Sequence, residues 1–466
     1  MRIRSFIACL LAVVLLLAGC QTRTPAGGGE NSLPGATRSE ALTAPAGSAA
    51  SQPGVTAPSH NPETTRPPTA SPSQSSSSAA PTAPVVTYEG VPDKPPAASA
   101  TVGKTEPTPS PSAPAPSAPG LTPLTPAQYY GRRLLEKDGD SRLLEAYQRM
   151  TACCAAYRES ADLTDLGLTL EEANRAFLYF LDDYPQYFWL DNQCTFQYFL
   201  QSKKVIAFEP RYTIAGAAAI DKAKAAVEAQ AAILLEGLHD GMDEFERERL
   251  IHDRLIRWVE YDVSQSKPHI HTLYGALANR EAVCDGYARA FQYLMGQAGL
   301  QCLLVRGNAG GEGHAWNVAR INGAYYQVDV TWDDPVGMDD PDYVYYGYLN
   351  LTDADMTRDH TPETEIPLPV CAATADNYFL RGGYTASALE AGQFGDAVAR
   401  QVNDGARGWY QILYTGAALS EERLADFLNG NAEAIRSRAS KGIAGGRLPA
   451  LSRYALNDNI IQLLFE

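Results

Sequence analysis

Residues 313–329 read GHAWNVARINGAYYQVD, and this stretch decides the fold of the central part of the chain. Asn322-Gly323, between two runs rich in β-branched and aromatic residues, is the strongest short signal for a β-hairpin with a two-residue turn. We therefore expect strands over 315–321 and 324–330, with a third strand-like run at 302–306. A turn of two residues also sets which residues lie opposite one another along both strands.

That register brings one histidine and one aspartate to the same face of the hairpin. Counting outward from the turn, His314 lies opposite Thr331, and Asp329, two residues before Thr331, points to the same face. Diagonal neighbours have Cβ atoms roughly 7–8 Å apart or somewhat less, a gap that an imidazole and a carboxylate can span. Such a hydrogen bond selects the tautomer of the imidazole and stabilises its charged form.

A cysteine upstream of the hairpin completes a possible catalytic group. Residues 281–288, EAVCDGYA, open a predicted helix that ends near Gly299. Cys284 stands at the start of this helix, where free backbone N–H groups and the helix dipole favour a thiolate. Its own N–H would point to where a tetrahedral oxyanion forms. Together with an oriented histidine, this arrangement predicts an activated nucleophile for acyl transfer.

Three blocks of sequence resemble the transglutaminase-like domain, a branch of the papain-like fold. They are VCDGYA at 283–288, GHAWN at 313–317 and YQVDVTWDDP at 326–335, and the resemblance extends over roughly 240–360. It implies a helix bearing the cysteine, packed on an antiparallel sheet, and a catalytic triad of Cys284, His314 and Asp329. In that family the cysteine attacks a carboxamide or peptide carbonyl to form a thioester, and the acyl group then passes to an amine or to water.

The resemblance also suggests a second oxyanion donor. Tyr274, within HTLYGAL at 271–277, is the candidate, ten residues before the nucleophile. No cofactor and no metal site are predicted. The acidic run at Asp333, Asp334, Asp339, Asp340 and Asp342 is interpreted as a solvated loop.

The folded part is expected to be α+β, with a transglutaminase-like core over 241–365. A helical region over 126–240 precedes it, and a small α/β unit over 375–466 follows it. Thr169 with Glu172 and Asp243 with Glu246 are predicted helix starts. An alanine-rich helix is expected from Ala217.

The first twenty residues form a predicted lipoprotein signal peptide. Arg2 and Arg4 precede an apolar run of about 13 residues, too short to span a bilayer, which needs about 20. Leu17-Ala18-Gly19-Cys20 resembles the lipobox of bacterial lipoproteins, in which the cysteine is lipidated; the alternative is an ordinary cleavage site that precedes a cysteine. Because two acyl chains suffice for stable anchoring, the protein is expected outside the cytoplasm, anchored to the bacterial cell membrane.

Composition separates a linker from the fold. Residues 21–125 hold about two thirds of the 31 prolines, mixed with Ser, Thr, Ala and Gly, and are predicted to be a disordered linker. The formal net charge of the chain is −16, without Lys/Arg clusters, which argues against nucleic acid as a partner. The cysteine spacing matches no zinc ribbon or finger, and no disulfide framework is predicted.

These observations support three hypotheses. The first is an extracytoplasmic cysteine hydrolase or acyltransferase that acts on a peptide or protein, including cell-wall peptides. The second is a non-catalytic binding or scaffolding lipoprotein that keeps the fold. The third is a zinc site made of Cys284, His314 and Asp329. The oligomeric state is left open.

Overall fold

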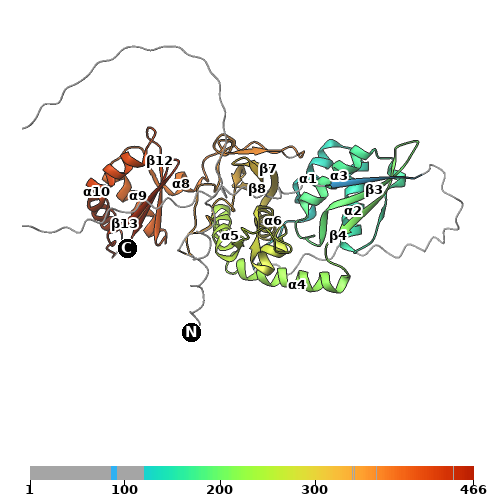
Figure 1. Cartoon of the computed structure of the whole chain (residues 1–466), viewed down its shortest axis with the longest axis horizontal. Helices are drawn as coiled ribbons and strands as arrows, with labels where there is room; N and C mark the ends of the chain where they lie inside the picture. Colours follow the sequence, from blue (N-terminus) through green and yellow to red (C-terminus); the bar gives the residue numbers. More distant parts are fainter. Residues whose placement is uncertain (1–84, 92–119, 338–339, 341, 364, 444–445) are drawn as a thin grey trace, which may run out of the picture. The chain divides into compact units, whose positions relative to one another are not determined.

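The computed structural model describes residues 85–91, 120–337, 340, 342–363, 365–443 and 446–466 (Figure 1). The predicted signal peptide, Cys20 and most of the predicted linker lie outside the described residues. Within the described part, helices and strands alternate along the chain, and most of the strands form three four-stranded sheets. In the same part, no helix has both the length and the apolar character needed to cross a membrane.

The first sheet has the order β1-β3-β4-β2 and packs beside three helices. Its strands are β1 (Val85–Val91), β2 (Ala161–Asp162), β3 (Leu190–Phe199) and β4 (Val205–Tyr212). The helices are α1 (Tyr130–Asp138), α2 (Ser141–Ala155) and α3 (Leu170–Asp183), with 3-10 turns η1 (Pro126–Gln128) and η2 (Thr164–Leu166). The capping box of Thr169 and Glu172 at the start of α3 is confirmed.

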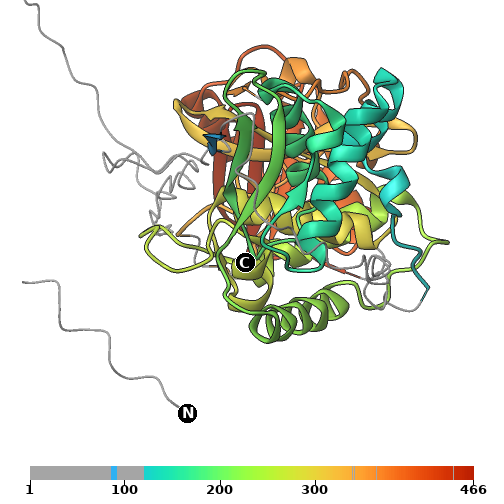
Figure 2. The same ribbon diagram turned by 90° about the vertical axis from the view of Figure 1, so that its right-hand side faces the viewer.

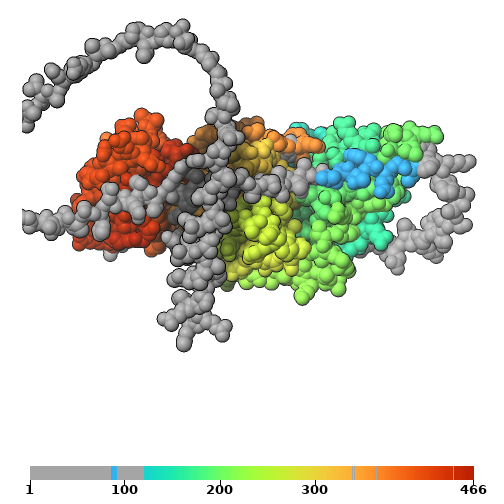
Figure 3. Space-filling view, in the orientation of Figure 1, coloured from blue at the N-terminus to red at the C-terminus, as the bar shows by residue number. Residues whose placement is uncertain are grey.

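Two expectations about this region are wrong. The expected helical region at 126–240 holds four α-helices but also a sheet, because β3 and β4 pair antiparallel within it. The apolar side chains of β3 alternate, with Cys194 and Phe196 buried between more exposed polar neighbours, which is the strand period rather than the helical one. Residues 85–91 of the expected linker form β1, which pairs parallel with β3 along its whole length and lies on the surface (Figure 3).

Two helices lead into the central sheet. The alanine-rich α4 (Ala217–Leu234) buries one stripe of side chains at helical spacing and runs along one side of the molecule (Figure 2). In α5 (Glu244–Trp258), the carboxylate of Asp243 accepts hydrogen bonds from the N–H groups of Phe245 at 3.1 Å and Glu246 at 3.3 Å. This confirms the second predicted helix start.

The central sheet has the order β10-β7-β8-β9 and is antiparallel throughout. Its strands are β7 (Gln301–Ala309), β8 (Glu312–Ile321), β9 (Ala324–Val328) and β10 (His360–Pro362). Helix α6 (Cys284–Gln297) packs on β7 and β8. The remaining elements are β5 (Glu260–Tyr261), the π-helical η3 (Gly275–Asn279), β6 (Glu281–Ala282) and α7 (Asp353–Met356).

The predicted two-residue hairpin is confirmed. Ile321 pairs with Ala324, and the ladder continues to Asn317 opposite Val328. Asn322 and Gly323 have φ angles of 49° and 87°, so both turn residues occupy the left-handed region that a type I′ turn requires.

The C-terminal region has a hydrophobic cluster of its own, between residues 386 and 465. Its sheet has the order β11-β12-β14-β13, with helices α9 and α10 packed together beside it. The elements are α8 (Tyr378–Gly382), β11 (Thr385–Ala386), α9 (Ala391–Asn403), β12 (Trp409–Tyr414), α10 (Glu421–Gly442), β13 (Leu451–Asn457) and β14 (Ile460–Phe465).

Candidate active site

Cys284 is the first residue of α6, directly after an extended Val283. The first N–H groups of a helix lack partners within the helix, so they can stabilise a negatively charged sulfur or an oxyanion formed beside it. Gly286 permits a close approach here, because a Cβ at this position would lie 2.4 Å from the carbonyl oxygen of Ile270. The apolar neighbours of Cys284 are Ala288, Leu304 and Ala315. The start of α6 therefore holds the thiol in a tight, mostly apolar setting.

The hairpin places His314 between the thiol and a carboxylate. Nε2 of His314 lies 2.6 Å from Oδ2 of Asp329. The Cys284 side chain lies close enough to the same imidazole to help raise its pKa, and it packs in one cluster with Ala315, the residue after His314. Because the Asp329 contact uses Nε2, Nδ1 is the ring nitrogen left for the sulfur. The structure thus brings together the three residues of the predicted triad.

Asp329 is held from several sides. It lies one residue beyond the end of β9, and its N–H donates to the carbonyl oxygen of Tyr348 at 3.1 Å. Its Oδ1 accepts from the N–H groups of Thr331 at 2.9 Å and Trp332 at 3.1 Å. The carboxylate is therefore fixed by a tight turn after the strand as well as by His314.

A second histidine contacts the same carboxylate, and nothing in the sequence patterns singled it out. Nε2 of His360, in β10, lies 3.0 Å from Oδ2 of Asp329, and its Nδ1 lies 2.5 Å from Oδ1 of Asp359. The ring is fully buried and packs against Trp332, with centroids 4.6 Å apart. Only the pairing of β10 with β7 brings this residue to the site.

Electrostatic interactions favour the charged form of His314. Burial acts against the charged ring, but the nearby Asp329 and Cys284 outweigh it and raise the pKa of His314 to about 10. Burial likewise acts to raise the pKa of Asp329, yet His314 and His360 lower it below its ordinary range. An imidazolium beside Cys284 stabilises a thiolate, which is the nucleophilic form of cysteine.

Two tyrosines are candidates for the second oxyanion donor. The ring of Tyr274 stacks on Phe188 and meets His269 edge-on, each with centroids 5.3 Å apart. Neither contact involves Cys284, so the role of Tyr274 stays a prediction. Tyr261 pairs with Ala282 across β5 and β6, two residues before the nucleophile, and burial together with the charges of Cys284 and Asp329 raises its pKa. Its neutral hydroxyl is a second candidate, visible only once the strands pair.

The site contains a group of atoms that a metal could use. His314, Asp329 and His360 each offer one ligand atom within 4.8 Å of the other two, whereas Cys284 is not part of this group among the described residues. Both Nε2 atoms are already hydrogen bonded to Oδ2 of Asp329. Hydrogen bonds therefore satisfy these atoms without an ion, and the zinc hypothesis with Cys284 gains no support from the geometry.

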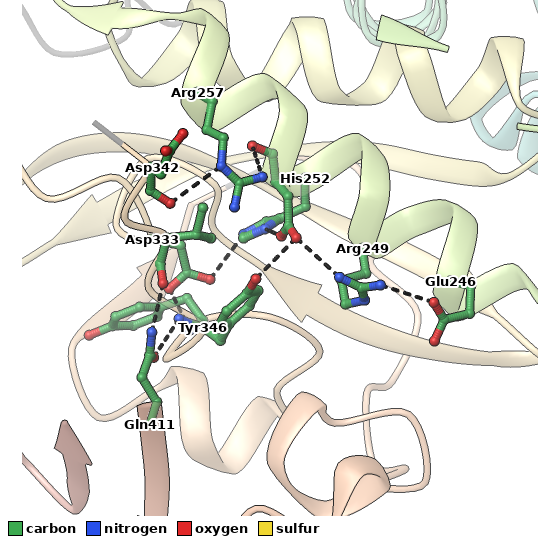
Figure 4. Close-up of polar contacts among 11 residues, drawn as sticks. Glu246, Arg249, His252, Arg257, Asp333, Asp342, Tyr346 and Gln411 are labelled. Carbon is green, nitrogen blue, oxygen red and sulfur yellow. Dashed lines mark hydrogen bonds and ion pairs between the residues drawn. The ribbon is translucent and has the colours of Figure 1, made fainter. Parts of the chain in front are cut away.

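The predicted solvated acidic loop is wrong for its first member. Asp333 is fully buried, and its Oδ2 lies 3.2 Å from Nε2 of His252 (Figure 4). Its Oδ1 accepts from the N–H of Tyr348 at 2.9 Å. Asp334 accepts from the hydroxyl of Tyr287 at 2.7 Å. Asp339 lies outside the described residues. These carboxylates hold the segment after Asp329 in place because buried partners, rather than water, satisfy them.

Residues 234–330 match the family model of the transglutaminase-like superfamily. The matched segment contains the start of α6 and the whole β8–β9 hairpin, with Cys284, His314 and Asp329. This part of the chain is therefore a transglutaminase-like domain of mixed helix and sheet. His360 lies beyond the matched residues.

Among particular proteins, the chain is similar to kyphoscoliosis peptidase of Mus musculus, with 30% identity over 110 residues, and of Homo sapiens, with 29% identity over 110 residues. Each match covers 20% of this chain and 17% of the relative, so the similarity is confined to a small part of those proteins. A solved structure of a TGase covers 32% of this chain and 45% of its own, at 10% identity and a TM-score of 0.22. A likeness at that level carries no argument about function.

Proposed function

We propose that this chain is an extracytoplasmic, membrane-anchored cysteine acyl-transfer enzyme acting on peptide or carboxamide bonds through a thioester. One observation carries the proposal: His314 contacts Asp329 at 2.6 Å through Nε2, and Cys284 lies close enough to the imidazole to help raise its pKa. A nucleophile, a base and a group that orients the base are the parts that acyl transfer needs.

The chemistry follows from these positions. The thiolate of Cys284 attacks the carbonyl carbon, a C–S bond forms, and the carbonyl electrons move to an oxyanion near the start of α6. His314 donates its proton to the departing amine as the C–N bond breaks, which leaves a thioester. Water or an amine then attacks the thioester, His314 takes a proton from it, and the C–S bond breaks. Hydrolysis makes the enzyme a peptidase or amidase, and an amine acceptor makes it a transglutaminase.

The anchored location is part of the same proposal. Cys20 ends a lipobox-like segment, and the proline-rich residues 21–84 between it and β1 would give the domain a reach of roughly 40–50 Å from the membrane. A domain on such an arm is suited to substrates in the cell wall or on surface proteins.

Trapping the acyl-enzyme tests the proposal. The protein is mixed with a glutamine-containing peptide or a cell-wall peptide, quenched in acid and analysed by mass spectrometry. We expect the mass of the acyl group on the peptide that contains Cys284, and its loss in Cys284→Ala. Cys302→Ala is the matched control, because Cys302 is also a buried free thiol, and it should retain the adduct. An adduct that survives in Cys284→Ala would refute the assignment.

The low exposure of the site favours a second candidate, a scaffold that has kept the fold without activity. Cys284 and His314 are each only 7% exposed. A scaffold predicts that cells carrying Cys284→Ala keep the wild-type phenotype. Loss of the phenotype with a folded variant protein would eliminate this candidate.

A further inference from the structure

His360 has an unusual position for a residue outside the predicted triad. Its two ring nitrogens contact two carboxylates, Asp359 at 2.5 Å and Asp329 at 3.0 Å. Its other neighbours are the rings of Trp316, Trp332 and Tyr348 and the imidazole of His314, whose centroid lies 5.6 Å away. Asp359 is itself held by the hydroxyl of Tyr348, which donates to Oδ2 at 2.7 Å.

These contacts define the charge of the His360 ring. A carboxylate oxygen only accepts hydrogen bonds, and a neutral imidazole has a single N–H. Both contacts are therefore hydrogen bonds at once only when the ring carries two N–H groups and a positive charge. Burial opposes that charge, but Asp329 and Asp359 outweigh it and raise the pKa of His360.

We propose that His360 is a positioning residue of the acyl-transfer site, an imidazolium that holds the carboxylate of Asp329 against His314. The inference rests on the proposed function and adds a residue to it. The resulting chain of hydrogen bonds runs from Asp359 through His360 and Asp329 to His314, and Cys284 lies close to His314.

The contact has two physical consequences. Oδ2 of Asp329 accepts from two imidazoles while Oδ1 accepts from two backbone N–H groups, so the carboxylate cannot rotate without losing several hydrogen bonds. The positive ring of His360 also interacts with the same carboxylate of Asp329 as His314 does, and it adds positive potential around Cys284. Removing that charge should leave the thiolate less stabilised, so Cys284 should react more slowly with an electrophile.

The rate of Cys284 alkylation by iodoacetamide, followed by peptide mass spectrometry from about pH 4 to pH 9, measures this effect. In His360→Gln the amide NH₂ can still donate to one of the two carboxylates, but the positive charge is lost. We expect the acidic midpoint to rise far enough to slow alkylation about three- to tenfold on the acidic side, since one pH unit is a tenfold change in thiolate. Asp359→Asn, a nearly isosteric change at a partly exposed position, should move the midpoint in the same direction by less.

His252→Gln is the matched control. Its ring is also fully buried between two carboxylates, Asp253 and Asp333, each at 3.2 Å, but it does not touch Asp329 (Figure 4). An equal shift in this variant would show general loosening and overturn the proposal. An unchanged midpoint in both His360→Gln and Asp359→Asn would overturn it too, as would a neutral His360 ring in the NMR spectrum near pH 7.

The same data separate this inference from the proposed function. If Cys284 in the wild-type protein reacts no faster than Cys302, the proposed function fails and the inference fails with it. If Cys284 reacts fast and its pH profile ignores His360, only the inference fails. The outcome that supports both is a fast thiol whose midpoint moves in the two variants near Asp329 and stays in His252→Gln.

Discussion

Replacing Asp329 by Asn tests the centre of the site. The carboxylate is fully buried and lies 2.6 Å from Nε2 of His314. Asn has the same shape without the charge, so Asp329→Asn removes the interaction that stabilises the imidazolium and leaves the volume unchanged. We expect a folded protein in which His314 is only about half charged at pH 7, so that Cys284 has largely lost its cationic partner.

The magnitude follows from the geometry. Two charges centred about 4 Å apart interact by about 4 kcal/mol at an effective dielectric constant of about 20. That energy would lower the pKa of His314 from about 10 to about 7. It also corresponds to about a thousandfold slower thioester formation, if the imidazolium–thiolate pair is lost in the reacting state.

NMR titration of the His314 ring measures this change, with His314→Gln used to assign its signal. Asp376→Asn is the control: Asp376 is also buried and accepts from Asn322 at 3.1 Å and Tyr326 at 3.3 Å, away from the site. His314 should titrate in this control as in the wild type. If folded Asp329→Asn protein still shows a His314 pKa near 10, the reasoning about the charge pair is wrong.

Three further predictions concern the framework around the site. Gly286→Ala should lower the free energy of unfolding by about 1–3 kcal/mol, because its Cβ would meet the Ile270 carbonyl oxygen at 2.4 Å. Gly296→Ala in the same helix, where a Cβ would have no atom within 4 Å, should leave the stability unchanged or raise it. Equal losses of stability in urea unfolding of the two variants would contradict this explanation. Burial raises the pKa of Glu248 from 4.5 to about 8, so its contribution to stability is complete below pH 4.5 and is lost as the pH rises through 8. Glu248→Gln should therefore be about 2–4 kcal/mol more stable than the wild type at high pH, relative to the difference at low pH, while exposed Glu236→Gln should follow the wild-type curve in thermal melts. Thr87→Pro removes a backbone donor from β1, so hydrogen exchange in β3 should speed up. The free energy of unfolding should change by less than about 1 kcal/mol, because the side chains of β1 are mostly exposed. Unchanged exchange would argue against the β1–β3 pairing.

Local sequence signals predicted the central part of this fold well. Asn322-Gly323 set the turn, and the ladder from Ile321 opposite Ala324 follows from its two-residue length. The side chains at Thr169 and Asp243 identified two helix starts, because capping involves residues only two or three positions apart. The contact between His314 and Asp329 was also expected from counting residues along one hairpin, although the β8–β9 ladder ends at Asn317 opposite Val328, short of the expected pair of His314 and Thr331.

The predictions from the sequence are wrong where a residue's partner is far away in the chain, or where a short segment was judged by the average composition of a longer stretch. The run of Val, Thr and Tyr in β1 is hidden within a long proline-rich stretch, and only the free edge of β3 provides its partner. Asp333 belongs to an acidic run that resembles a solvated loop, but His252, 81 residues earlier, buries it. Average composition describes neither case, because burial depends on what packs against a residue.

The sequence by itself determined the hairpin, its register and the helix start that carries Cys284. Each depends on backbone geometry within a few residues, which turn and capping residues specify directly. The tertiary structure decided that His360, 31 residues after Asp329 in the chain, shares this carboxylate with His314. It also decided that Tyr261 pairs with Ala282, two residues before the nucleophile. Those contacts depend on which strands pair and how the core closes, and no local pattern of residue types encodes that choice.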